Sequence, residues 1–164
     1  MNLYAAIPLA LHELASTMWI GGMFFALVAL RPTLKTVADP ALRIRLAIGS
    51  FRRFFPWVWG AIATLWISGF WIGIAAHGNR VALHVHLMMG IALIMTLIFA
   101  WLFVFPYRQM IRLATGYENW GWAGAKLALV RRLMAVNLGL GVLNVVIATT
   151  GPTLVPVLHS LFKG

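Results

Sequence analysis

The chain has 164 residues, of which 62% are apolar and 10% are charged, and its mean hydropathy is +0.91. Soluble domains are about 45–50% apolar and about 25% charged, so this composition excludes an ordinary soluble globular domain. The 13 Lys and Arg residues against 3 Asp and Glu residues give a formal net charge of +10. That charge suits either a nucleic-acid-binding protein or a membrane protein with basic loops, and the positions of the charges separate the two classes.

Four stretches of the chain are long, apolar and nearly free of charge, at residues 4–30, 56–76, 81–105 and 133–150. A helix needs about 20 apolar residues to cross the ~30 Å hydrocarbon core, where it satisfies its own backbone hydrogen bonds. Each stretch therefore predicts one transmembrane helix. We expect a single all-α domain over residues 1–164, an integral membrane four-helix bundle with long loops at residues 31–55 and 106–132.

Eleven of the basic residues lie in these two long loops, and only Arg80 and Lys163 lie elsewhere. Under the positive-inside rule the loops are cytoplasmic, and both termini lie on the outer (periplasmic) side of a bacterial inner (plasma) membrane. Such charges suit the lipid bilayer and its anionic headgroups, so no nucleic-acid partner is expected. In the first loop, Asp39-Pro40 is typical of a helix start, and the mixture of apolar residues and arginines after it predicts a surface helix.

All five histidines lie on or near the predicted outer side of the membrane: His12, His77, His84, His86 and His159. At about 1.5 Å rise per residue, His12 and His86 have similar depths in the outer leaflet, where ionisable residues are candidates for a functional site. His84 and His86 are two residues apart on one helix, so their rings point to nearly opposite faces. His77 and His159 suit an interfacial, hydrogen-bonded role.

Small and polar residues at helical spacing mark two further faces. A close-packing face is predicted for the second helix by Gly60, Thr64 and Ser68. A polar stripe facing the bundle interior is predicted for the fourth helix by Asn137, Gly141, Asn144 and Ala148. The chain contains no cysteine, which excludes disulfides and thiolate metal sites.

One interpretation of the histidines is a b-type haem between helices, with its iron bound by His12 and by His86 or His84. The small residues Gly22 and Gly90 would leave room for the porphyrin face. Trp19 would form an aromatic wall, and Arg80 would be an outer-side cation for the propionates. Neutral imidazoles without a thiolate suit electron transfer. The protein would then be a small membrane cytochrome b, or a membrane oxidoreductase, that exchanges electrons with quinol or another lipid-soluble partner.

A second interpretation is a copper site, because His and Met side chains together form a soft ligand set that favours Cu(I). The candidate copper ligands are His84, His86, Met88 and Met23. Methionine is also a normal packing residue of apolar bundles. A third interpretation is a non-catalytic subunit of a larger membrane complex, and the small-residue helix faces are compatible with a homo-oligomer.

Several runs of the sequence are similar to a known superfamily of membrane proteins. Residues 11–15 (LHELA) and 19–25 (WIGGMFF) resemble the first helix of the CopD-type copper-resistance proteins and of the related four-helix HemJ-type, protoporphyrinogen-oxidase-like proteins. Residues 84–90 (HVHLMMG) and 131–139 (RRLMAVNLG) fit the same superfamily. The resemblance covers most of the chain and implies the same four-helix membrane fold.

This resemblance also implies a ligand. Copper uptake is associated with the CopD-type proteins, whereas the HemJ-type branch binds b haem through a histidine of the first helix, which corresponds to His12 in this chain. The HemJ-type pattern has a lysine where His86 stands here. A histidine at this position implies a second protein ligand for a haem iron or for another metal ion. The resemblance therefore argues against protoporphyrinogen oxidation as the activity of this chain.

Overall fold

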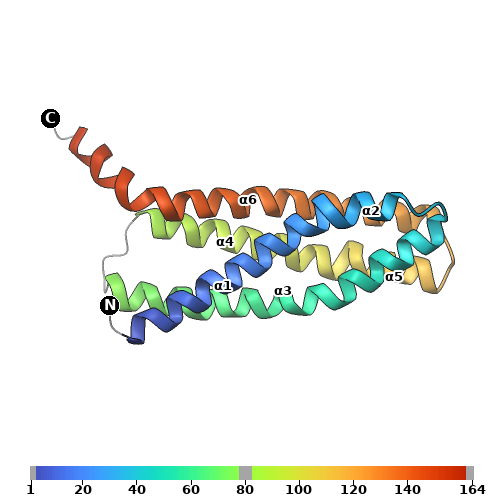
Figure 1. Ribbon diagram of the computed structural model, residues 1–164, viewed down its shortest axis with the longest axis horizontal. Helices are drawn as coiled ribbons and strands as arrows, with labels where there is room; N and C mark the ends of the chain where they lie inside the picture. The colour runs from blue at the N-terminus through green and yellow to red at the C-terminus, as the bar shows by residue number, and fades with distance from the viewer. Residues whose placement is uncertain (1–2, 78–82, 162–164) are drawn as a thin grey trace.

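The computed structural model describes the backbone of residues 3–77 and 83–161 and the side chains of residues 6–73 and 83–152. Within these residues every regular element is helical, and the helices form four long rods (Figure 1). Four segments are long and apolar enough to cross a membrane: Ala6–Lys35, Pro40–Gly73, Leu83–Thr115 and Trp120–Pro152. The predicted all-α fold with four membrane-spanning helices is confirmed, and the chain belongs to the class of multi-pass membrane proteins.

The first and third rods are composite, each with a short π-helical segment between two α-helices. The first rod contains α1 (Leu3–Phe25), η1 (Ala26–Leu30) and α2 (Arg31–Lys35). The third rod contains α4 (Leu83–Leu102), η2 (Phe103–Tyr107) and α5 (Arg108–Thr115). A proline lies close to each change of helix type, Pro32 in α2 and Pro106 within η2. Because proline has no N–H to donate, it interrupts the α-helical hydrogen-bond pattern, and a π-helical segment accommodates the interruption.

The second and fourth rods are single helices, α3 (Pro40–His77) and α6 (Trp120–Leu161). At the start of α3 the Asp39 carboxylate accepts hydrogen bonds from the backbone N–H groups of Ala41 (2.9 Å) and Leu42 (3.2 Å), as an N-cap residue does. The helix start predicted at Asp39-Pro40 is therefore correct. The separate surface helix is not observed, because this segment forms the first turns of α3, which continues past Pro56.

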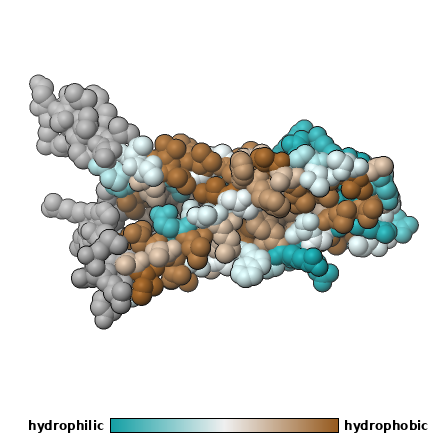
Figure 2. All heavy atoms as spheres, in the orientation of Figure 1, coloured by the Kyte–Doolittle hydropathy of each residue, from teal (hydrophilic) through white to brown (hydrophobic). Residues whose placement is uncertain are grey.

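Both helices extend beyond their predicted boundaries at residues 56 and 133 because arginines are compatible with a helix that projects past the apolar layer. Their long side chains can reach water from there. Figure 2 shows apolar residues over the middle of the visible surface and hydrophilic residues gathered toward the end where α2 and α5 lie. This distribution is the one expected for a bundle in contact with a lipid bilayer.

The rods pack mainly in two pairs, α1 against α3 and α4 against α6. Gly22 of α1 allows the close approach of α3, because a Cβ at this position would collide with the Phe54 ring. In the second pair, Asn137 of α6 is 1% exposed. Its Nδ2 donates a hydrogen bond to the backbone carbonyl of Met95 in α4 at 3.1 Å.

Aromatic rings form the central core. The Phe55 side chain is 1% exposed, and its ring centroid lies 4.8 Å from that of Tyr107 and 5.3 Å from that of Phe99. Both pairs are close to perpendicular, an arrangement that aromatic quadrupoles favour. Trp19 of α1 adjoins the same cluster, with its ring centroid 6.3 Å from Phe99. The cluster therefore connects α1, α3, α4 and η2.

Candidate functional site

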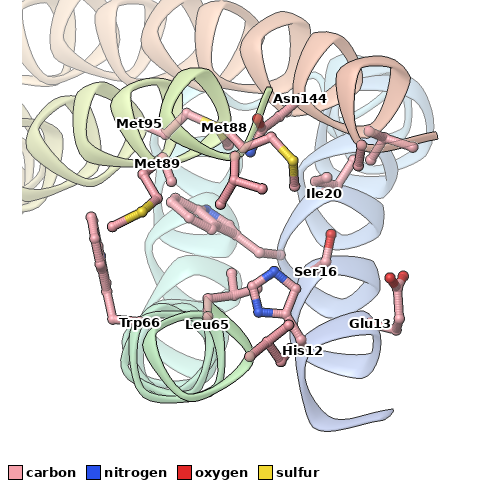
Figure 3. A pocket seen from close by; sticks show the side chains of 18 of the residues that line it. His12, Glu13, Ser16, Ile20, Leu65, Trp66, Met88, Met89, Met95 and Asn144 are labelled. Atoms are coloured by element: carbon pink, nitrogen blue, oxygen red, sulfur yellow. The ribbon is translucent and has the colours of Figure 1, made fainter. Parts of the chain in front are cut away.

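A cavity of about 350 Å³ lies between α1, α3, α4 and α6. This volume is within the range of about 300–1,000 Å³ that is usual for small-molecule sites. Apolar and aromatic side chains make up most of its wall, with a few polar groups among them. In Figure 3, His12 and Ser16 come from α1, Leu65 and Trp66 from α3, Met88, Met89 and Met95 from α4, and Asn144 from α6.

His12 is held on one side of this cavity by a hydrogen bond to α3. Its Nδ1 atom lies 3.0 Å from Ser68 Oγ. The Ser68 hydroxyl donates its one proton to the backbone carbonyl of Thr64 at 2.6 Å, so its oxygen acts as acceptor toward the imidazole. We therefore assign the proton of the neutral ring to Nδ1, which leaves a lone pair on Nε2. Metal-binding imidazoles are usually oriented by such a hydrogen bond from the other ring nitrogen.

The backbone of α3 also shapes the space around this ring. A Cβ at Gly69 would lie 3.3 Å from His12 Cε1, closer than most van der Waals contacts. The missing side chain thus allows the imidazole to pack against the helix. Figure 3 shows that the Glu13 carboxylate, on the next residue of α1, is directed away from the His12 ring. The hydroxyl of Ser68, and not this carboxylate, is the side-chain hydrogen-bond partner of His12.

His84 of α4 also lines the cavity. It packs against Gly151 of α6, where a Cβ would lie only 2.6 Å from His84 Cβ. Its Nδ1 atom is buried and has no hydrogen-bond partner among the described residues. His86, two residues further along α4, is exposed and is not part of the cavity wall. The two imidazoles that the described residues contribute to the cavity are thus His12 and His84.

Of the residues expected to surround a haem, Trp19 lies in the cavity wall, whereas Gly22 and Gly90 do not. Trp19 lines the cavity and is 3% exposed, and its buried indole Nε1 has no hydrogen-bond partner in the described part of the chain. Gly22 lies against Phe54 instead of the cavity. Gly90 is exposed, and a Cβ there would have no neighbour within 4 Å. Arg80 lies outside the described residues.

The candidate copper ligands are also separated. His84 and Met88 are one helical turn apart on α4, and both line the cavity. Met23 is buried in the core, 2% exposed, and is not part of the cavity wall, and neither is His86. The side chains of His77 and His159 lie outside the described residues, so their predicted interfacial role stays a prediction.

Three polar contributions to the site were not predicted as such. Ser68 was expected on a close-packing face, and only the tertiary structure brings its hydroxyl to His12. Trp66 Nε1 donates a hydrogen bond to Thr96 Oγ1 at 3.2 Å, which connects α3 to α4 in the cavity wall. Asn144 lies on the predicted interior stripe, and its Oδ1 is buried without a partner among the side chains and backbone that the structure describes. The sequence signal for Ser68 is its four-residue spacing from Thr64, which places both on a single face.

The donor set limits what the cavity can bind. Among the described residues no group of three or more His, Cys, Asp or Glu side chains is gathered for a metal ion. A bare transition metal usually needs three or four protein ligands, whereas a haem iron needs only one or two, because the porphyrin provides the others. The buried unpartnered atoms of His84, Trp19 and Asn144 also suit a ligand with a polar centre and an apolar body. None of the described side chains of the wall is Lys or Arg.

The fold and the cavity define a multi-pass helical membrane protein with an apolar, imidazole-containing site between its helices. No protein-family model, curated protein or solved structure shows a significant match to this chain. The resemblance to the CopD-type and HemJ-type proteins therefore stays a prediction based on the runs of sequence that suggest it.

Proposed function

We propose that this protein is a small membrane cytochrome b that binds haem b in the cavity, with His12 and His84 as the iron ligands. The observation that carries the proposal is the pair of imidazoles that α1 and α4 contribute to one apolar cavity. A third protein ligand of the His, Cys, Asp or Glu type is not gathered with them among the described residues. His12 and His84 would be the two protein ligands of the haem iron, and a haem b held in this way would supply one-electron transfer.

Each residue of the site has a distinct role in this proposal. His12 presents Nε2, because Ser68 accepts the hydrogen bond from Nδ1 and fixes the orientation of the ring. His84 is held by its contact with Gly151. The aromatic walls, including Trp19, exclude water and provide flat apolar surfaces. Because the cavity lies in the apolar part of a membrane protein, we propose quinol or another lipid-soluble molecule as the redox partner.

An absorption spectrum tests the proposal. The protein is purified after expression with adequate haem supply, together with the variants His12→Ala, His84→Ala and His86→Ala. We expect a Soret band in the wild type and in His86→Ala, whose exposed ring is the matched control on the same helix. His12→Ala and His84→Ala should lose the band or change the spin state of the iron. Absence of haem from the wild type would refute the cytochrome proposal, and an effect confined to His86→Ala would refute the ligand pair.

Copper binding is the second candidate function, and the observation in its favour is the arrangement of His84 and Met88 on one face of α4. Met89 and Met95 also line the cavity, so its wall contains thioether sulfurs as well as the imidazole of His84. Soft ligands of this kind favour Cu(I). Copper titration followed by metal analysis discriminates the two functions. One equivalent of copper in a haem-free wild type, lost in Met88→Leu, would replace the cytochrome proposal, and binding of neither group would favour a non-catalytic subunit.

A further inference from the structure

A basic groove lies on the surface of α3, apart from the cavity between the helices. It is lined by three arginines together with small and apolar residues of the same helix: Arg45, Leu46, Gly49, Ser50, Arg52 and Arg53. Arg52 follows Arg45 by seven residues, two turns of helix, so both lie on one face. Figure 2 shows hydrophilic surface on the α3 side of the molecule, directly beside the apolar middle of the bundle. The groove therefore lies between the basic first turns of α3 and its apolar part.

The guanidinium groups of the groove are available to a ligand. Arg45 is held against α6, because its guanidinium carbon lies 5.1 Å from the centroid of the Trp120 ring. Stacking of this kind fixes the plane of the guanidinium and leaves the N–H groups at its edge free to donate. Arg52 and Arg53 are exposed, and neither forms a hydrogen bond or an ion pair with any residue that the structure describes.

The acidic residues of the chain do not neutralise these charges. Glu13 lines the cavity on α1, and the Asp39 carboxylate already accepts two backbone hydrogen bonds at the start of α3. Glu118 is exposed and lies two residues before Trp120, but it forms no ion pair with Arg45 in the described part of the chain. Three positive charges thus line one groove without a carboxylate, and the ligand that complements them is an anion.

The floor of the groove leaves room for such an anion. Gly49 is exposed, and a Cβ at this position would have no described neighbour within 4 Å. The Ser50 hydroxyl donates its proton to the Leu46 carbonyl at 2.9 Å, so the side-chain donors that remain for a ligand are the guanidinium groups. Paired N–H donors of a planar guanidinium match the spacing of two phosphate oxygens. The donor set therefore suits a phosphate group.

The groove continues into an apolar surface on the same helix. Leu46, within the groove, is 44% exposed, and Trp57, four residues beyond Arg53, is 65% exposed. Four residues of helix correspond to about 6 Å along its axis, and exposed tryptophans are typical of the boundary between lipid headgroups and acyl chains. Further along α3, Ile67 is 71% exposed. A basic site followed at this distance by an apolar surface matches a phospholipid better than a free ion.

We propose that this groove of α3 binds an anionic phospholipid, with the lipid phosphate between Arg45, Arg52 and Arg53 and an acyl chain along the Trp57 side of the helix. Basic residues next to a membrane-spanning segment attract anionic lipids of the cytoplasmic leaflet, and the positive-inside rule predicts that this end of the bundle is cytoplasmic. The site is separate from the cavity, and it does not depend on whether the cavity holds haem.

Thermal unfolding of the purified, delipidated full-length protein in a neutral detergent tests this site. The unfolding midpoint is measured during titration with phosphatidylglycerol, with phosphatidylcholine of the same acyl chains, and with inorganic phosphate. Chloride keeps the ionic strength constant, which separates a specific site from general screening. The titration curves give an apparent Kd for each lipid and each variant.

Two pairs of variants separate the groove from the overall charge of the protein. Arg53→Gln removes one donor of the groove, and Arg132→Gln, its control, removes the same charge from an exposed residue of α6. Gly49→Leu fills the floor of the groove and leaves every charge in place. Its control is Gly21→Leu, which adds the same side chain at another exposed helix glycine with no described atom within 4 Å of its Cβ.

We expect phosphatidylglycerol to raise the midpoint of the wild type and of both controls, while phosphatidylcholine and inorganic phosphate have little effect. Arg53→Gln and Gly49→Leu should each weaken the apparent affinity for phosphatidylglycerol by about tenfold, the factor that corresponds to loss of one charge-assisted hydrogen bond.

Four results would overturn the proposal. A wild-type midpoint that phosphatidylglycerol does not change would mean that the lipid has no site, and an equal response to phosphatidylcholine would mean that the lipid charge is not recognised. Equal losses in Arg53→Gln and Arg132→Gln would indicate a general charge effect. A response to inorganic phosphate as large as that to phosphatidylglycerol would identify free phosphate as the ligand. If Arg53→Gln does not fold, Gly49→Leu decides, and an unweakened response in this variant would refute the groove as the site.

Discussion

Replacement of Ser68 by alanine tests the hydrogen bond that orients His12. Ser68 is 4% exposed, and its oxygen accepts from His12 Nδ1 at 3.0 Å while its proton is donated to the Thr64 carbonyl at 2.6 Å. The alanine leaves Nδ1–H without this acceptor. We expect a loss of about 1 kcal/mol in the free energy of unfolding, the usual net value of one hydrogen bond. Haem affinity should fall by about 10- to 100-fold, as it does when the partner of a ligand imidazole is removed.

Ser50→Ala is the matched control for this substitution. Ser50 is also on α3, and its hydroxyl donates to the Leu46 carbonyl at 2.9 Å, the same bond to the preceding turn that Ser68 makes. The hydrogen bond of Ser50 goes to the backbone, whereas Ser68 also contacts His12. Haem titration of the apoprotein, followed at the Soret band, gives the affinities of both variants. ¹⁵N NMR of labelled histidine shows which ring nitrogen carries the proton, and the spectrum of His12→Ala assigns the signal.

The result that would refute this reasoning is an equal haem affinity for Ser68→Ala and Ser50→Ala. The tautomer assignment would be refuted separately if the wild-type His12 signal showed the proton on Nε2. A lower affinity in Ser68→Ala with an unchanged proton position would mean that the serine acts by packing and not by orienting the imidazole.

Two further predictions concern the contacts that shape the site and the core. Gly151→Ala should displace His84, because the added methyl would lie 2.6 Å from its Cβ. The haem spectrum should therefore change, and the free energy of unfolding should fall by about 1–3 kcal/mol. Gly139→Ala is the control and should behave as wild type, because no described atom lies within 4 Å of the added Cβ. Phe55→Ala should lower the free energy of unfolding by about 3–5 kcal/mol in a denaturant titration, since it removes a side chain that is 1% exposed from the aromatic core. Phe105→Ala, at a position that is 50% exposed, should cost much less, and equal losses would contradict the packing described for Phe55.

The number of membrane-spanning helices could be predicted because hydropathy is a property of local sequence. The start of α3 was equally accessible, since the bonds from Asp39 reach only two and three residues ahead. The helix ends were less accessible. The predicted helices end at basic residues, although a helix continues wherever its backbone hydrogen bonds can form. The π-helical segments before Pro32 and around Pro106 produce no change in the hydropathy pattern.

The candidate site also has features that the local sequence predicts and features that it does not predict. The two-residue spacing predicts that His84 and His86 point to nearly opposite faces of one helix, but not which face points inward. In a soluble bundle the apolar face would reveal the interior. In a membrane bundle the exterior is apolar too: Leu14 is 62% exposed and Ile67 is 71% exposed. Hydropathy therefore could not identify His84 as the cavity residue.

From the sequence alone follow the class of the protein, the number of its membrane-spanning helices and the candidate histidines, because each depends on composition or on neighbours along the chain. The tertiary structure decided which residues meet: His84 with Gly151, His12 with Ser68, and Gly22 with Phe54. These contacts join helices that are far apart in the sequence. Their geometry depends on how the rods cross and on their rotation about their own axes, which periodicity within a single helix does not determine.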